Sequence, residues 1–259
     1  MNILFIGDIV GEPGRKTVAR LVPKLARERG VEFVIANAEN AAGGFGVTPN
    51  VARELFAVGV HVLTSGNHIW DKKEIMAYIK DEPRLLRPAN YPQGSPGNGS
   101  VVVTTASGDK VGVVQVMGRV AMPTLDCPFR VGRREVEVLR RDTHIVIVDM
   151  HAEATSEKMA MGWYLDGDVS GVFGTHTHVQ TADERILPKG TAYLTEVGMV
   201  GPSESVIGVT KEIAIEKFLT QMPRRFEVAP GPCVFSAVLL DVDTTTGRAV
   251  SIERLRIQE

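Results

Sequence analysis

Side chains that bind metal ions occur in this chain in short polar blocks, each directly after a run of apolar residues. Carboxylate, amide and imidazole groups are common oxygen and nitrogen donors of metal sites in proteins. Loop polarity alone would supply Ser, Lys and Gly at such positions as often as Asp, Glu, Asn and His. The pattern therefore predicts a metal site. Its candidate residues, block by block, are Asp8, then Glu39 and Asn40, then Asn67 and His68, then His151, and finally His176 and His178.

The donor types indicate which metals the site would take and how many. Imidazole with carboxylate and amide oxygens, and no thiolate, suits Zn, Mn or Fe better than the all-oxygen sites of Ca or Mg. About seven or eight candidate ligands are too many for one tetrahedral ion, and they fit two ions that share a bridging ligand. Such a pair of ions clamps both the attacking and the leaving oxygen of a phosphate ester. The donor set is therefore compatible with hydrolysis of phosphate esters.

The elements that must position these blocks alternate between strand and helix in the first half of the chain. Asn2–Ile6, Phe33–Ala36 and Val60–Thr64 are short apolar runs, and apolar residues between them repeat at helical spacing. This order predicts right-handed βαβ units and hence a mainly parallel sheet. In open α/β sheets ligands bind beyond the carboxyl ends of the strands, where the polar blocks lie.

Hairpin patterns follow in the second half of the chain. Ser100–Thr105 with Lys110–Val116, and Val234–Val242 with Ala249–Ile257, are pairs of strand-like runs joined by short polar turns. Antiparallel hairpins beside parallel units predict an α/β fold with two sheets and flanking helices. Because no internal repeat and no long linker is present, we expect residues 1–259 to form a single domain.

Two local patterns carry predictions of their own. Asp71 followed by Glu74 resembles a capping box for a helix that contains Ile75. Asp71 also lies three residues after His68, so orienting that ring is the alternative role for its carboxylate. Pro23 lies inside a helical pattern, where we expect it to kink the helix or interrupt its hydrogen-bond ladder.

The composition bounds the classes of protein to which this chain can belong. The 29 Lys and Arg against 31 Asp and Glu give a formal charge of −2, which does not support stable nucleic-acid binding. No apolar run approaches the roughly 18–20 residues of a membrane span, and the N-terminus lacks the form of a signal peptide. With only two cysteines, Cys127 and Cys233, we expect a cytoplasmic protein. A homo-oligomer is left open.

The same polar blocks, in the same order, resemble the signature of the calcineurin-like metallophosphoesterases. More closely, Gly7–Gly11, Ala38–Gly44 and Thr64–His68 resemble the YmdB-like bacterial branch of phosphodiesterases. The resemblance spans essentially the whole chain. It implies a four-layer metallophosphoesterase sandwich, with two central mixed β-sheets flanked by helices, and a dinuclear metal site. It also implies hydrolysis of phosphodiesters, 2′,3′-cyclic nucleotides above all, by in-line attack of a metal-bridging hydroxide.

Carried over position by position, the resemblance assigns each candidate residue a role. His68 would be the catalytic residue near the leaving group. Iron is the metal we expect first, with manganese and zinc as alternatives. The metal ligands implied are Asp8 and His178 on the first ion, Glu39 as the bridge, and Asn67, His151 and His176 on the second ion.

The sequence departs from the pattern of the broad superfamily in two ligand positions. The usual Asp-x-His is here Asp8-Ile9-Val10, so one histidine ligand is missing, and the usual bridging Asp is Glu39. Our hypothesis is that the carbonyl oxygen of Asn40 replaces the lost ligand.

Other functions compete with this interpretation. Gly11–Thr17 follows a strand and precedes a helix as a P-loop does, but Arg15 separates Gly14 from Lys16 and breaks the motif. A dinuclear hydrolase of carboxylic esters or amides is a second alternative. The third is a regulatory metal-binding protein with little turnover that acts through a protein or nucleotide partner. The sequence assigns no role to the loop 87–99 or to the pair Arg224-Arg225.

Overall fold

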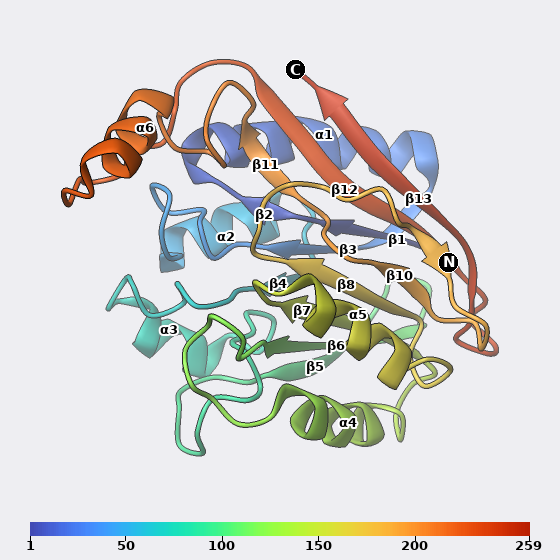
Figure 1. The fold of residues 1–259 in the computed structure, drawn as a ribbon. Coiled ribbons are helices and arrows are strands. Elements are labelled where there is room, and N and C mark those ends of the chain that lie inside the picture. The colour runs from blue at the N-terminus through green and yellow to red at the C-terminus, as the bar shows by residue number, and fades with distance from the viewer.

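The computed structural model describes residues 1–259, and two β-sheets pack against each other at its centre (Figure 1). The seven strands of the first sheet are β1 (Asn2–Ile6), β2 (Asp8–Ile9), β3 (Val31–Asn37), β4 (Val62–Thr64), β11 (Met199–Pro202), β12 (Cys233–Val242) and β13 (Ala249–Gln258). Their order is β2-β11-β12-β1-β3-β4, with β13 beside β12. The neighbours β1, β3 and β4 run parallel, as the alternating pattern predicts.

The second sheet is also mixed. Its six strands are β5 (Ser100–Thr104), β6 (Lys110–Met117), β7 (Ile145–His151), β8 (Gly171–Thr175), β9 (Arg185–Ile186) and β10 (Ala192–Leu194). They follow the order β5-β6-β7-β8-β10-β9. The central four strands run parallel, whereas β5 and β9 pair antiparallel at the two edges.

Helices cover the outer faces of both sheets. The six helices are α1 (Gly11–Arg29), α2 (Pro49–Ala57), α3 (Ile75–Asp81), α4 (Pro128–Leu139), α5 (Thr155–Tyr164) and α6 (Lys211–Thr220). Apolar residues of α1, α2 and α3 form one core cluster with the seven-stranded sheet, and those of α4 and α5 form another with the six-stranded sheet. These layers confirm the predicted four-layer sandwich. α6 projects from the body at the left of Figure 1 and buries only Ala214.

Strand β1 shows how the two central layers are held together. Ile3 and Phe5 point into the core between the sheets, whereas Leu4 and Ile6 point toward the helices. The ring of Phe5 packs on Phe173 of β8, with 5.2 Å between ring centroids. A strand buried on both faces in this way appears in the sequence as a continuous apolar run.

The local patterns have mixed outcomes. α1 runs through Pro23 as one continuous helix, and this proline, which has no N–H, cannot donate its own bond of the ladder. The capping box was a wrong prediction: α3 begins after Glu74, which makes no side-chain cap, and Asp71 lies outside the helix. The carboxylate of Asp71 instead pairs with Nδ1 of His68 at 2.9 Å, which is the alternative role.

Two features without a predicted role have structural partners. Arg87 donates to the backbone carbonyl of Pro88 at 2.8 Å and to two other carbonyls of the loop 87–99, which fixes the path of that loop. Arg224 donates from Nε to Oε1 of Glu216 in α6 at 3.1 Å, and both side chains are exposed. An exposed ion pair of this kind contributes little to stability.

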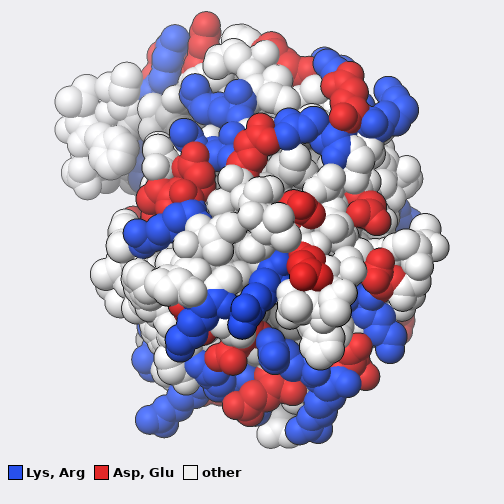
Figure 2. Space-filling model, turned by 90° about the vertical axis from the view of Figure 1, so that its right-hand side faces the viewer, with Lys and Arg blue, Asp and Glu red and all other residues white.

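The surface agrees with the near balance of charges. Figure 2 shows one face of the molecule, on which Lys and Arg are interspersed with Asp and Glu. That face therefore carries no extended basic stripe of the kind that follows a nucleic-acid backbone. No helix combines the length and the apolar composition that a membrane span requires.

Candidate metal centre

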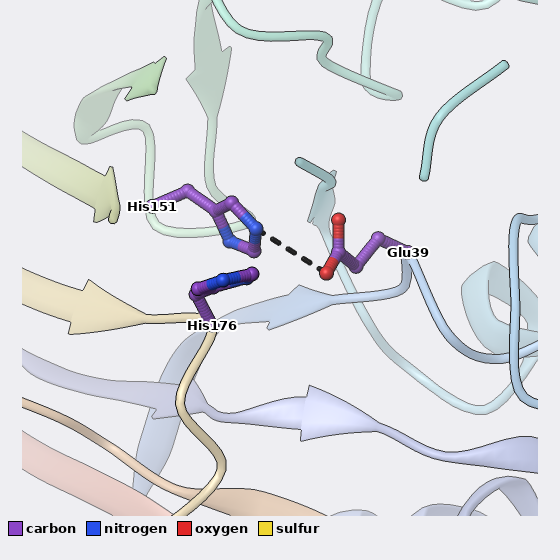
Figure 3. Close-up of side chains that lie close together, drawn as sticks. All are labelled: Glu39, His151 and His176. Atoms are coloured by element: carbon purple, nitrogen blue, oxygen red, sulfur yellow. Dashed lines mark ion pairs between the residues drawn. The ribbon is translucent and has the colours of Figure 1, made fainter. Parts of the chain in front are cut away.

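Three side chains from three strand ends point toward one another at one edge of the sandwich (Figure 3). Glu39 lies in the loop after β3, His151 is the last residue of β7, and His176 follows β8. One ligand atom of each lies within 4.8 Å of the others. The pair His151 Nε2 and Glu39 Oε1 is separated by 3.2 Å. Two imidazoles and a carboxylate at this spacing could hold one transition-metal ion.

Three further donors, Asn40, His178 and Asp8, join this group. The Nδ2 atom of Asn40 lies 3.3 Å from Glu39 Oε1 and 3.1 Å from His178 Nε2. Oδ2 of Asp8 accepts a hydrogen bond from the backbone N–H of His176 at 3.1 Å. The contacts of Asn40 and of His151 both meet at Oε1 of Glu39, so this carboxylate is the group that the two parts of the network share.

Asn67 and His68 complete the predicted set. Oδ1 of Asn67 lies 3.0 Å from His151 Nε2, and the backbone N–H of His68 donates to Glu39 Oε2 at 3.2 Å. The structure thus connects all eight sequence-predicted residues in one network of contacts, although they come from five separate parts of the chain.

Two observations test whether these residues fit metal ions. Asp8 Oδ1 and His176 Nδ1 are buried without a hydrogen-bond partner in the protein, which is costly unless another group binds them. Gly66 lets Glu39 and His151 approach the backbone closely, because a Cβ there would lie 2.2 Å from Glu39 Oε2 and from His151 Nε2. Both features fit a site built around cations.

Burial shifts the pKa values of three candidate ligands, His176, His178 and Asp8. It lowers the pKa of the His176 imidazole to about 3, with help from the charge of His151, and it lowers the pKa of His178. Burial also raises the pKa of the Asp8 carboxyl well above its usual range. Neutral imidazoles are the form that binds a metal, whereas a protonated Asp8 would have to lose its proton.

Glu39 and His151 form a buried ion pair. Burial opposes the charge on both groups, but their mutual attraction and hydrogen bond outweigh it. The pair lowers the pKa of Glu39 to about 2 and raises the pKa of His151 to about 9. A protonated His151 would have to lose that proton before it could bind a metal ion.

The loop 176–178 has an irregular backbone that brings two histidines to the same site. His176 and His178 have φ values of 104° and 66°, which side chains other than glycine rarely adopt. In an extended segment residues two apart would point to the same face, so the positive φ values of this turn set the separate directions of the two rings. The turn is held by Glu196, whose Oε2 accepts from the backbone N–H and the hydroxyl of Thr177 at 3.1 and 2.7 Å.

Glu196 is itself part of a buried pair that the sequence did not reveal. Its Oε2 lies 2.6 Å from Nζ of Lys158 in α5, and both side chains are almost fully buried. Its Oε1 accepts from the backbone N–H of Gly198 at 3.0 Å. Nothing in the sequence links residues 38 positions apart on a helix and a loop, so no local signal could have identified them.

Asp149 acts on the site through an intermediate hydroxyl. Nδ1 of His151 lies 2.9 Å from Thr175 Oγ1, and that hydroxyl donates to Asp149 Oδ1 at 2.7 Å. Burial raises the pKa of Asp149 to about 6. Asn37, in the same buried layer, accepts from the backbone N–H of Glu39 at 3.0 Å. Partners of this kind orient the imidazole of a metal ligand.

A pocket of about 290 Å³ opens beside the network. Five of the eight predicted site residues line it, namely Glu39, Asn40, His68, His176 and His178. The apolar residues that line it are Val10, Phe45, Ile207, Val209, Phe226 and Val228. A molecule in this pocket could therefore contact both the candidate metal ligands and apolar side chains.

Comparison with known proteins identifies the family of this chain. The model of the YmdB-like protein family matches residues 4–255. The chain therefore belongs to the YmdB-like family, as its polar blocks predicted. The 2′,3′-cyclic-nucleotide 2′-phosphodiesterase of Bacillus subtilis is 49% identical over 259 residues, which is 100% of this chain and 98% of that protein.

Two solved structures share the YmdB-like fold over the whole chain. A hypothetical protein from Thermus thermophilus has a TM-score of 0.93 and 44% identity, with 100% of both chains covered. A phosphatase from Mycoplasma pneumoniae also has a TM-score of 0.93, with 36% identity, and covers 100% of this chain and 93% of its own. These relatives confirm the metallophosphoesterase sandwich and agree with a phosphoesterase site.

Proposed function

We propose that this YmdB-like protein is a dinuclear-metal phosphodiesterase that hydrolyses 2′,3′-cyclic nucleotides. The observation that carries the proposal is the network around Glu39, in which Asp8 Oδ1 and His176 Nδ1 are buried without protein partners. The 49% identity to a 2′,3′-cyclic-nucleotide 2′-phosphodiesterase over the whole chain supports the substrate class. We further propose a cytoplasmic location, in keeping with two cysteines that form no disulfide.

The ligand assignment follows the family resemblance, with Asn40 added as a ligand of the first ion. The first ion would take Asp8, Asn40 and His178, and the second would take Asn67, His151 and His176, with Glu39 between them. The set of imidazole, carboxylate and amide donors suits iron first and manganese or zinc next.

The chain's own residues can position and protonate the substrate. When bound, the two ions supply a water-derived nucleophile near neutral pH and offset the negative charge of the phosphate. His68 lines the pocket and is half-buried, and Asp71 fixes its ring through Nδ1 at 2.9 Å. This leaves Nε2 to donate a proton to the departing ribose oxygen, O2′ of the cyclic ester.

A substrate panel tests the proposal. Manganese-loaded protein is given 2′,3′-cyclic AMP and 3′,5′-cyclic AMP, and the products are separated by chromatography. We expect chelator-sensitive conversion of the 2′,3′-isomer to the 3′-monophosphate and little turnover of the 3′,5′-isomer. Bound metal without any turnover would reject the enzyme and favour the regulatory alternative.

The role of His68 is tested in the same assay. We expect His68→Gln to lower kcat roughly 100-fold or more without changing metal content, because it removes a proton donor and leaves the ligands in place. His144→Gln is the matched control, since His144 is exposed just before β7. Equal activity of both variants would exclude His68 as the proton donor.

A further inference from the structure

Two half-exposed phenylalanine rings flank the pocket beside the metal centre. Phe45 and Phe226 both line it, their ring planes differ by 19°, and their centroids are 6.5 Å apart. This distance is near the upper end of the range for aromatic pairs in contact, so neither ring fully covers the other. Accessible, near-parallel aromatic faces are the platform on which proteins stack nucleobases.

The position of Phe45 matches the geometry of a nucleotide. Its ring lies 5.0 Å from the ring of His68 at an angle of 65°, and the backbone N–H of His68 bonds Glu39. A phosphate held beside Glu39 would place the ribose near His68. The base, on the opposite side of the ribose ring, would then lie at Phe45.

Both rings are presented by their local structure. Phe45 lies between Gly44 and Gly46, whose φ values of 97° and 76° make sharp turns on either side of it. Phe226 lies in the segment between α6 and β12, and Nζ of Lys217 is 4.2 Å from its ring centroid. That cation–π contact restrains the ring.

We propose that Phe45 and Phe226 form a base-binding subsite, which makes the protein select nucleoside cyclic phosphates over phosphodiesters without a base. The subsite rests on the proposed function. Because every base has a π face, it accepts purines and pyrimidines, and the larger purines gain more contact.

A base-free substrate isolates the contribution of the subsite. Manganese-loaded protein is assayed with 2′,3′-cyclic AMP and with 1-O-methyl-ribofuranoside 2,3-cyclic phosphate, which has the same reacting ring. We expect kcat/KM to favour the nucleotide roughly tenfold or more. Phe45→Ala and Phe226→Ala should each reduce this ratio severalfold, and Phe226→Tyr should retain it. In calorimetry, adenosine 3′-phosphate should bind the wild-type and Phe226→Tyr proteins more tightly than the Phe45→Ala and Phe226→Ala variants.

The control is another phenylalanine of the same region. Phe218 of α6 is 75% exposed and does not line the pocket, so Phe218→Ala should leave the ratio unchanged. Equal kcat/KM for both substrates in the wild-type protein would overturn the subsite while the proposed function stands. Equal losses on both substrates in the Phe45 and Phe226 variants would also overturn it, because they would indicate a structural role. Turnover of neither substrate would reject the proposed function and the subsite together.

Discussion

The amide of Asn40 faces the ring of His178, with 3.1 Å between Nδ2 and Nε2. Rotation of this amide by half a turn would bring its carbonyl oxygen to the same place, where a cation could bind both groups. We therefore expect Asn40→Ala to lose part of the bound metal and to lower turnover at least roughly tenfold. Asn40→Asp keeps an oxygen donor and should retain more metal, as elemental analysis would measure. Unchanged metal content in Asn40→Ala would refute the assignment.

The proton on His151 predicts how metal binding depends on pH. Its pKa is raised to about 9 by Glu39, so the ring is protonated at pH 7 and must lose that proton to bind metal. Loading at pH 7 should therefore release at least about one proton per chain, and this release should decline as the pH rises through 9. Calorimetry in two buffers of different ionisation enthalpy measures the number of protons released. Heats that do not depend on the buffer at pH 7 would contradict the prediction.

Gly66 is the position where the smallest added group should be most harmful. The methyl group of Gly66→Ala would lie 2.2 Å from Glu39 Oε2 and His151 Nε2, so these ligands must move apart. We expect loss of metal binding and a decrease of about 1–3 kcal/mol in the free energy of unfolding. Gly132→Ala is the control, because an added Cβ at this position of α4 would lie 3.6 Å from its nearest neighbour and alanine favours helix. Equal metal content in both variants would show that Gly66 is not needed for the site.

At the scale of elements, the turn 176–178 depends on a buried ion pair behind it. Lys158→Met would leave Glu196 buried without its cation, at a cost of about 3–5 kcal/mol in the free energy of unfolding. It should also weaken metal binding, because Glu196 holds Thr177 between two ligands. Lys16→Met is the control: its pair with Glu12 is 70% and 63% exposed, so its loss should hardly change the urea midpoint. Similar urea midpoints for the two variants would contradict this account.

The elements that the sequence predicted are those with a regular pattern. Apolar runs such as Asn2–Ile6 and amphipathic repeats identified the main strands and helices, because burial on one or both faces leaves a period in the sequence. The two-residue strands β2 and β9 leave no such period and were not predicted. The capping box failed because the carboxylate of Asp71 pairs with His68, a choice that local spacing does not decide.

At the scale of the whole molecule, the site joins the two sheets. Asp8, Glu39 and Asn67 belong to or follow strands of the seven-stranded sheet, whereas His151 and the turn 176–178 come from the six-stranded sheet. The polar residues at the strand ends and the family resemblance together predicted that these residues form one site. The sequence could not predict the buried supports, such as Lys158 with Glu196, because their contacts depend on how the sheets and helices stack.

The central claim is that two ions act together in one phosphodiesterase site. The most direct measurement is to titrate metal-free protein with Mn²⁺ while following hydrolysis of 2′,3′-cyclic AMP and the metal bound per chain. The account predicts that activity is low at one equivalent, reaches its plateau near two bound ions per chain, and is abolished by chelator. Full activity in the metal-free protein, or a plateau at a single bound ion, would contradict it.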